Sequence, residues 1–205
     1  MLDEYPKEFE VRDGQNVTIR LLTRADEDRA LMFFLTIGEA DRDFLRYDVT
    51  DRETLEGWFG GPNWEEVFPF VAEVGGRIAG LAVLHGFRTR WHAHIGNAWT
   101  MVGEDWRGLG IGRIMATELF SFASELGLEK LLAEIRGDHL DAMRIYKQMG
   151  YVHEGVHTDY IKDADGRTHD LVLMACDIKD YWRRLDEGPH KLKEYVVPTN
   201  FADNI

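Results

Sequence analysis

The sequence predicts an α/β fold of the α+β type, in which a single mixed, mostly antiparallel β-sheet carries helices on both faces. Two apolar runs, 68–74 and 77–85, are joined by two glycines, which is a strong hairpin signal. A second hairpin is predicted over 151–161 and 168–176. Between the hairpins, strands alternate with helices, which favours a mixed sheet covered on both faces. The predicted order is β-α-α-β-β-β-α-β-α-β-β.

The first half of the chain begins with an alternating strand over 17–22. Thr23 then caps a helix whose first turn carries acidic residues, as the helix dipole favours. Thr50 and Glu53 form a capping-box pair before a second short helix, which Gly60-Gly61-Pro62 stops. After the first hairpin, a further strand is predicted to follow.

That further strand covers 92–102 and leads through a Gly-rich segment into a helix over 111–126. The apolar residues of this helix recur at helical spacing, and a glycine occupies its C′ position. A strand over 128–135 and a short helix over 141–149 follow before the second hairpin. These elements predict one domain over 17–176, preceded by an N-terminal extension, 1–16, and followed by a C-terminal tail, 177–205, with a short helical stretch around Tyr181-Trp182.

The composition excludes some functions and leaves others open. The 205 residues carry a formal charge of −13, so nucleic acid and anionic membranes should repel the chain. Cys176 is the only cysteine and lies in a predicted strand, which favours a packing role and a reducing compartment. No signal peptide and no apolar run long enough to span a membrane is visible. We therefore expect a cytoplasmic location.

A Gly-rich segment over 102–113, with the sequence VGEDWRGLGIGR, leaves a strand and enters a helix. Glycines let the backbone approach a ligand, and the N–H groups at a helix start form an anion site. Arg107 and Arg113 add positive charge. The spacing differs from a dinucleotide-binding G-x-G-x-x-G, and the Gly-Lys-Ser/Thr of a P-loop is absent. A diphosphate fits such a turn.

Two motifs resemble landmarks of one family. Arg107-x-x-Gly110-x-Gly112 is similar to the Q/R-x-x-G-x-G/A signature of the GNAT superfamily of acyl-CoA-dependent N-acetyltransferases. Downstream, Ala142 to Tyr151, with Tyr146 at its centre, resembles the family's A-x-x-x-Y-x-x-x-G-F/Y motif. The order of elements matches from about residue 17 to 176, so the resemblance implies an N-acyltransferase domain with this fold.

By position, the resemblance implies acetyl-CoA as cosubstrate. The backbone of Thr100, Met101 and Val102 would pair with pantetheine, and Tyr146 would protonate the leaving thiolate. Many members carry Asn where this chain has His139, so that contact would pass through an imidazole. The pyrophosphate would be held by the backbone amides of the Gly-rich turn, with Arg107 beside it. These amides belong to Gly108, Leu109, Gly110, Ile111, Gly112 and Arg113.

An amine attacks a thioester only in its neutral form, so a transferase of this kind needs a general base. Glu134 lies on an otherwise apolar strand and matches the glutamate given this role in the protein N-terminal acetyltransferase branch. His94 is the alternative, because His92 and His94 alternate on the predicted strand beside the cofactor and share one face. No third ligand has a convincing spacing for zinc, so no metal is expected.

Three hypotheses remain at this point. The acceptor is either a small amine, such as an amino acid or polyamine, or a peptide amine at a protein N-terminus or lysine. The third hypothesis is a CoA-binding sensor or regulatory module without catalysis. The resemblance also implies a possible homodimer, to which the tail could contribute.

Overall fold

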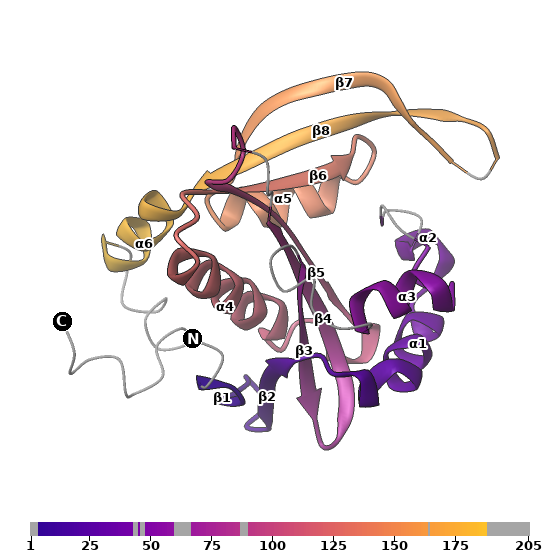
Figure 1. Ribbon diagram of the computed structural model, residues 1–205, viewed down its shortest axis with the longest axis vertical. Coiled ribbons are helices and arrows are strands. Elements are labelled where there is room, and N and C mark those ends of the chain that lie inside the picture. The colour runs from indigo at the N-terminus through magenta and orange to yellow at the C-terminus, as the bar shows by residue number, and fades with distance from the viewer. Residues whose placement is uncertain are drawn as a thin grey trace.

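The computed structural model describes residues 4–42, 45, 48–59, 67–86, 90–163 and 165–187. It contains one eight-stranded sheet in the order β1-β2-β3-β4-β5-β6-β8-β7 (Figure 1). Every neighbouring pair is antiparallel except β5 with β6. The prediction of a single mixed, mostly antiparallel sheet is therefore confirmed. The strands are β1 (Lys7–Glu10), β2 (Asn16–Leu21), β3 (Val67–Val74), β4 (Arg77–Gly86), β5 (Ile95–Val102), β6 (Lys130–Arg136), β7 (Val152–Lys162) and β8 (Thr168–Asp177).

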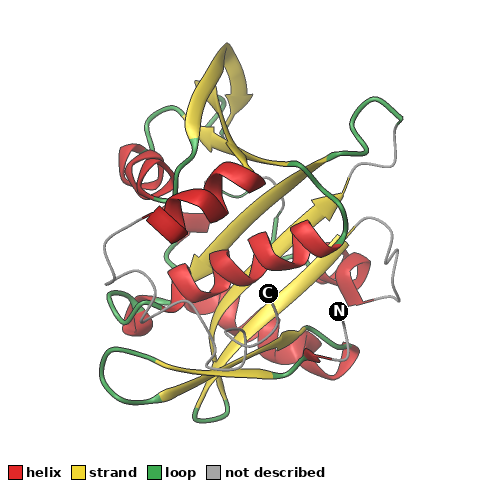
Figure 2. Ribbon diagram, turned by 90° about the vertical axis from the view of Figure 1, so that its left-hand side faces the viewer, coloured by secondary structure: helices red, strands yellow, loops and turns green. Residues whose placement is uncertain are grey.

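Helices cover both faces of the sheet, as predicted (Figure 1). One face carries α1 (Glu27–Thr36), α2 (Glu39–Arg42) and α3 (Arg52–Phe59). The other carries α4 (Ile111–Glu125), α5 (Leu140–Gln148) and α6 (Ile178–Glu187). Figure 2 shows α4 lying across the strands on this second face. None of the described helices is long and apolar enough to cross a membrane.

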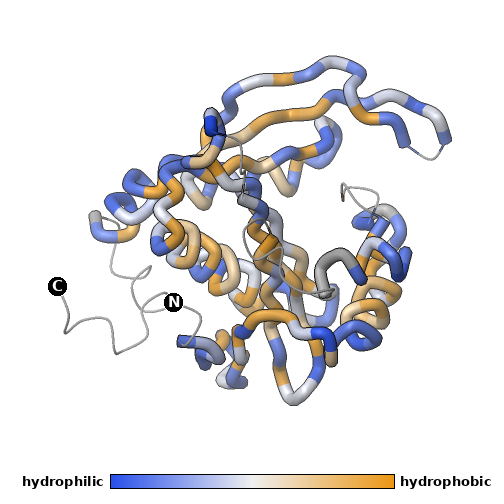
Figure 3. The backbone as a smooth tube through the Cα atoms, in the orientation of Figure 1, coloured by the Kyte–Doolittle hydropathy of each residue, from blue (hydrophilic) through white to orange (hydrophobic). Residues whose placement is uncertain are grey.

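The alternation of side chains along the central strands divides the core between the two faces. On β5, Ala98 packs with the α4 side, whereas Trp99 and Met101 pack with the α1 side. On β6, Leu131, Ala133 and Ile135 are buried on the α4 side, which leaves the residues between them facing the other way. Figure 3 shows the apolar residues concentrated in the central strands and α4, while β7 is mostly polar.

Two segments differ from the prediction. Strand β1 lies in the segment assigned to an N-terminal extension, where it pairs with β2. Glu118 of α4 also anchors this segment, because it accepts hydrogen bonds from Tyr5 Oη at 2.9 Å and Lys7 Nζ at 3.0 Å. The strand predicted over 92–102 begins only at Ile95. The helical stretch predicted around Tyr181 is α6. The predicted helix stop at Gly60-Gly61-Pro62 and the tail beyond residue 187 lie outside the described residues.

The short pairing between β5 and β6 determines where a site can form. These parallel strands share only three registered pairs, Ile95–Lys130, Gly96–Leu131 and Asn97–Leu132. Beyond them, β5 continues to Val102 and β6 to Arg136 without pairing with each other. The two strands therefore separate toward their carboxyl ends, and the sheet opens there.

Candidate active site

The opened edge of β5 offers backbone groups to an extended ligand. One edge of β5 pairs with β4 from Gly96 to Val102. The other edge pairs with β6 only as far as Asn97, and no other described strand takes over beyond that point. An extended chain with amide groups can add to such an edge. The segment predicted to pair with pantetheine, Thr100 to Val102, lies on this edge.

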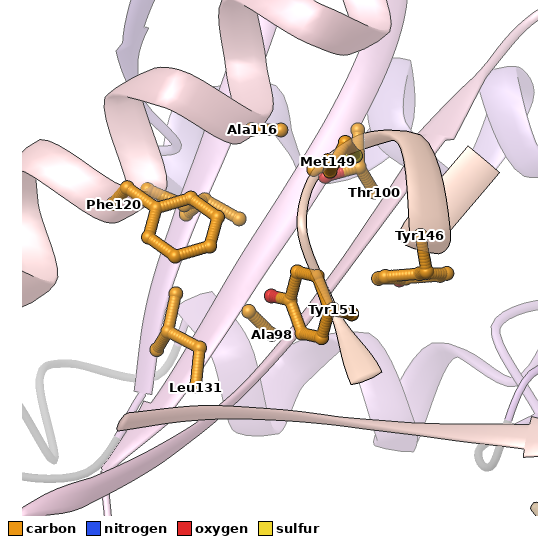
Figure 4. Close-up of a pocket in the computed structure, with 9 residues that line it drawn as sticks. Ala98, Thr100, Ala116, Phe120, Leu131, Tyr146, Met149 and Tyr151 are labelled. Carbon is orange, nitrogen blue, oxygen red and sulfur yellow. The ribbon is translucent and has the colours of Figure 1, made fainter. Parts of the chain in front are cut away.

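A small cavity lies where the two strands part, on the α4 side of the sheet (Figure 4). Ala98 and Thr100 line it from β5, Ala116 and Phe120 from α4, and Tyr146 from α5. The amphipathic pattern of α5 places Tyr146 here, because its apolar residues recur on the face that packs against the core. The structure thus brings the predicted acid next to the strand predicted to bind the cofactor.

Tyr146 is half-buried, and its ring packs edge-on against Tyr151 with the centroids 4.9 Å apart. Burial raises the pKa of Tyr146 to about 12, because the phenolate would lose hydration in this apolar cavity. The phenol is consequently protonated throughout the neutral pH range. It has the protonation state that a proton donor requires.

The Gly-rich turn follows β5 and a short 3₁₀ turn, η3 (Glu104–Trp106). Gly108 and Gly110 adopt φ values of +79° and +97°, which L side chains rarely adopt. Within the described residues, the backbone N–H groups of Gly108, Leu109 and Gly110 donate no hydrogen bond, whereas that of Arg113 bonds Gly110 O at 3.0 Å. These unused donors stand at the N-terminus of α4, which is the arrangement that binds anions.

Sequence reasoning missed a residue that supports this turn. Arg12, in the connection between β1 and β2, donates its backbone N–H to Leu109 O at 3.2 Å and its guanidinium Nη1 to Gly108 O at 3.0 Å. These bonds use the carbonyl oxygens of Gly108 and Leu109 and leave the N–H groups of the turn available for a ligand. No local sequence pattern marks Arg12, because the contact spans 96 positions along the chain.

The two arginines predicted at the diphosphate site, Arg107 and Arg113, have different neighbours in the structure. Arg107 forms an ion pair with Asp41 of α2 at 2.5 Å and donates to Val102 O at 3.3 Å, so its guanidinium leans toward the α2 side. Arg113 is exposed on the first turn of α4 and faces a separate hollow. Contact between either side chain and a diphosphate stays a prediction.

His139 occupies the N-cap position of α5, three residues after the end of β6. It therefore lies on the β6 side of the opening, and its predicted contact with the cofactor arm stays a prediction. Burial lowers the pKa of His139, and the nearby carboxylates of Asp41, Asp138 and Asp141 oppose this effect. The net shift favours the neutral imidazole at pH 7.

Glu134 lies on the part of β6 that has separated from β5. It is exposed, and it points away from its buried neighbours Ala133 and Ile135. Because those neighbours face α4, Glu134 faces the side of the sheet that carries α1 to α3. Tyr146 and Glu134 therefore lie on opposite sides of the opened sheet.

The predicted placement of His92 and His94 on a strand is wrong. His92 and His94 are exposed residues of a turn that is closed by the Ile95 N–H donating to His92 O at 2.8 Å. They do not alternate on a strand. His94 immediately precedes β5, at the end where β5 pairs with β6, and its role as the base stays a prediction. The alternation of His92, Ala93, His94 and Ile95 is compatible with a strand, which explains the error.

The described residues also bear on two further kinds of chemistry, metal binding and thiol chemistry. No group of three or more His, Cys, Asp or Glu residues able to hold a metal occurs in the described part of the chain. Cys176 is buried, and burial raises its thiol pKa to about 11. A thiol of that pKa is not a nucleophile at neutral pH, so Cys176 is a packing residue.

Comparisons with known proteins agree with this geometry. A solved structure of a ribosomal-protein-alanine N-acetyltransferase from Brucella melitensis is 26% identical, with 78% of this chain and 98% of that chain covered at a TM-score of 0.67. A spermidine N-acetyltransferase chimera from Vibrio cholerae and hSSAT is 20% identical, with coverages of 82% and 99% and a TM-score of 0.68.

Among curated proteins, YwnH of Bacillus subtilis (strain 168), whose name describes it as a putative phosphinothricin acetyltransferase, is 23% identical over 131 residues, which are 63% of this chain and 79% of YwnH. The model of the acetyltransferase (GNAT) family matches residues 29–151, more than half of the chain. The protein therefore belongs to the GNAT family of acetyltransferases.

Proposed function

We propose that this acetyltransferase moves the acetyl group of acetyl-CoA to a primary amine by direct attack in a ternary complex. One observation carries the proposal. The opened edge of β5 ends in a turn with unused N–H donors, and a protonated phenol lies beside that edge. This arrangement combines a strand-like binding edge, an anion site and an acid.

The residues present fit acetyl-CoA. The N–H groups of Gly108, Leu109 and Gly110 would hold the diphosphate, and Arg12 would keep that turn in position. The open edge from Ala98 to Val102 would pair with the amide-containing arm. When bound, acetyl-CoA would supply a thioester whose carbonyl carbon accepts the amine.

The chain's own residues would then manage the protons. Glu134, on the α1 side of the sheet, would remove a proton from the acceptor amine, directly or through water. Amides of β5 would donate to the carbonyl oxygen as it gains charge. Tyr146, on the α4 side, would give its proton to the leaving sulfur. Because these groups lie on opposite sides of the opened sheet, the acceptor would enter from the face of α1 to α3.

The acceptor is proposed to be a primary amine, either a small molecule or a peptide. The names of three relatives mention phosphinothricin, the alanine of a ribosomal protein, and spermidine, all of which present primary amines. A panel of phosphinothricin, spermidine and a peptide with N-terminal alanine therefore covers both classes. Family membership gives no support to the alternative of a sensor without catalysis.

Replacing Gly110 by tryptophan should abolish acetyl-CoA binding. Gly110 has a φ of +97°, so the substitution strains the turn and places a bulky ring at the proposed diphosphate site. Isothermal titration of acetyl-CoA and of CoA into both proteins measures the effect. Gly166→Trp is the matched control, because Gly166 has a φ of +81° in the distant β7–β8 turn.

Binding to the wild type and to the Gly166→Trp protein, but not to the Gly110→Trp protein, would support the proposed site. If the wild type binds neither ligand, the proposal is wrong. Equal binding by Gly110→Trp and the wild type would contradict the assignment of the diphosphate to this turn.

Replacing Glu134 by glutamine should lower kcat by roughly 10²-fold near pH 7, because the amide cannot accept the proton of the amine. The affinity for acetyl-CoA should stay unchanged, since Glu134 faces the other side of the sheet. Steady-state rates between pH 6 and 9 (roughly the range over which amines titrate) provide the measurement. Glu129→Gln makes the same change at an exposed residue before β6 and should have no effect. A Glu134→Gln rate equal to that of the wild type would exclude Glu134 as the base.

A further inference from the structure

A second hollow lies outside the catalytic cavity, between the start of α4, the end of α5 and α6. Its wall contains three cationic side chains and several apolar ones. They are Arg113, Lys147, Arg184, Ala116, Met149 and Leu185. The residues come from three separate helices, and α6 lies beyond the segment 29–151 that the family model matches.

Helix α6 is firmly attached at this place. The Tyr181 ring stacks on Phe120 of α4 with the centroids 3.7 Å apart and an interplanar angle of 2°. Its hydroxyl shares a hydrogen bond of 2.7 Å with Thr117 Oγ1. One turn later, Arg184 Nη1 donates to Gly150 O at 2.9 Å, at the end of α5. The Arg184 guanidinium is therefore fixed in the wall of the hollow.

The charges of the hollow are uncompensated. Within the described residues, Arg113, Lys147 and Arg184 form no ion pair with a carboxylate. The adjacent Arg183, in contrast, bonds Asp180 at 2.8 Å, and Arg20, Arg52 and Arg107 are likewise ion-paired. In a chain with a formal charge of −13, three gathered cations without a carboxylate favour an anionic ligand.

The hollow also adjoins the proposed diphosphate site. Arg113 is the third residue of α4, so the hollow begins where the Gly-rich turn ends. A ligand held by its diphosphate at that turn can reach the hollow with its next substituents. The apolar side chains of Ala116, Met149 and Leu185 suit a flat base, and the cations suit a phosphate monoester, which carries about −1.5 to −2 charges at neutral pH.

We propose that this hollow binds the 3′-phosphoadenosine end of CoA, and that α6 thereby completes the cofactor site. The inference rests on the proposed function and goes beyond it. It makes the enzyme selective for CoA over 3′-dephospho-CoA, through a helix outside the family-matched segment. Arg184 and Lys147 are the residues that provide this selectivity together with Arg113.

Titration of CoA and of 3′-dephospho-CoA into the full-length protein tests the inference. The wild type should bind CoA about 10- to 100-fold more tightly, because the phosphate forms charge-assisted hydrogen bonds with these cations. Arg184→Met and Lys147→Met should each reduce that preference several-fold through weaker binding of CoA. The affinity for 3′-dephospho-CoA should stay the same in both variants. Arg183→Met, which alters the neighbouring ion-paired arginine, should leave both affinities unchanged.

The outcomes separate this inference from the function on which it rests. If the wild type binds neither compound, the proposed function fails. If it binds both equally well, the function stands and the inference is overturned. An undiminished preference in both Arg184→Met and Lys147→Met also overturns it, because the phosphate then binds elsewhere. If Arg184→Met weakens the binding of both compounds equally, the change has disturbed the fold around α6, and the result for Lys147→Met then decides. Lys147 is exposed, so its replacement should leave the fold intact. An unchanged preference for CoA in Lys147→Met would then overturn the inference.

Discussion

Replacing Tyr146 by phenylalanine is expected to lower kcat by about 10²- to 10⁴-fold, the range that a positioned acid contributes. The ring would keep its packing against Tyr151 and its place in the cavity, so only the proton donor is lost. Because burial raises the pKa of Tyr146 to about 12, the wild-type phenol is fully protonated at the pH of the assay. The effect should therefore appear in kcat, with little change in the affinity for acetyl-CoA.

Steady-state kinetics with the best acceptor of the amine panel provide the measurement. Tyr151→Phe is the control, because Tyr151 lines the same cavity but is buried, at 3% exposed, whereas Tyr146 is only partly buried. It should leave kcat within a few-fold of the wild type. A Tyr146→Phe enzyme as fast as the wild type would show that another group, or water, protonates the sulfur.

The second large effect concerns stability. Asp26 is 3% exposed and accepts hydrogen bonds from both terminal nitrogens of Arg20, each at 2.7 Å. Thr23 donates to it from its backbone N–H and its hydroxyl at 2.9 Å, and Arg29 adds a further bond at 2.9 Å. Arg20 and Arg29 also both bond Glu73 on β3. This network joins the start of α1 to the sheet.

Asp26→Asn should lower the free energy of unfolding by about 3–5 kcal/mol, because it leaves partly buried arginines without their charge partner. Urea unfolding at neutral pH measures the loss. Asp28→Asn is the control, since that carboxylate is exposed and its pair with Arg52 should contribute less than about 1 kcal/mol. Equal losses for the two variants would show that the network adds nothing beyond a surface ion pair.

The same carboxylate makes stability depend on pH in a defined direction. Burial by itself would raise the pKa of Asp26, but the bonds from Arg20 and Thr23 outweigh it and lower the pKa to about 2. A folded-state pKa below the unfolded value of about 3.9 stabilises the fold above that pH. This contribution should decline as the pH falls from about 4 toward 2, and Asp26→Asn should lack that decline.

Much of the fold could be read from local sequence. The two glycines between β3 and β4 predicted that hairpin, and the helical spacing of apolar residues predicted α4. Strand β1 was missed because Lys7 to Glu10 is short and charged, and because Glu118, 111 residues away from Lys7, holds it in place. Local patterns do not carry contacts of that separation.

In the candidate site, too, features encoded by local sequence were predicted and contacts between distant residues were missed. The Gly-rich turn and Tyr146 lie in contiguous motifs, and the structure places them around one opening. The strand predicted to contain His94 was wrong at its start, because residues 91–94 form a turn. The role of His94 as a base stays a prediction. Arg12 and Arg184 escaped notice because each approaches the site from an element outside the motifs. Only the packed structure shows that both lie beside the predicted cofactor-binding elements.

The two faces of the sheet have an evolutionary consequence. Under the proposed arrangement, the cofactor is handled by β5, α4, α5 and α6, whereas the acceptor meets the surface bordered by α1 to α3. Substitutions on the acceptor face can alter specificity while the machinery for the thioester stays intact. Solved structures named for spermidine and for the alanine of a ribosomal protein share this fold, so the fold alone does not name the acceptor.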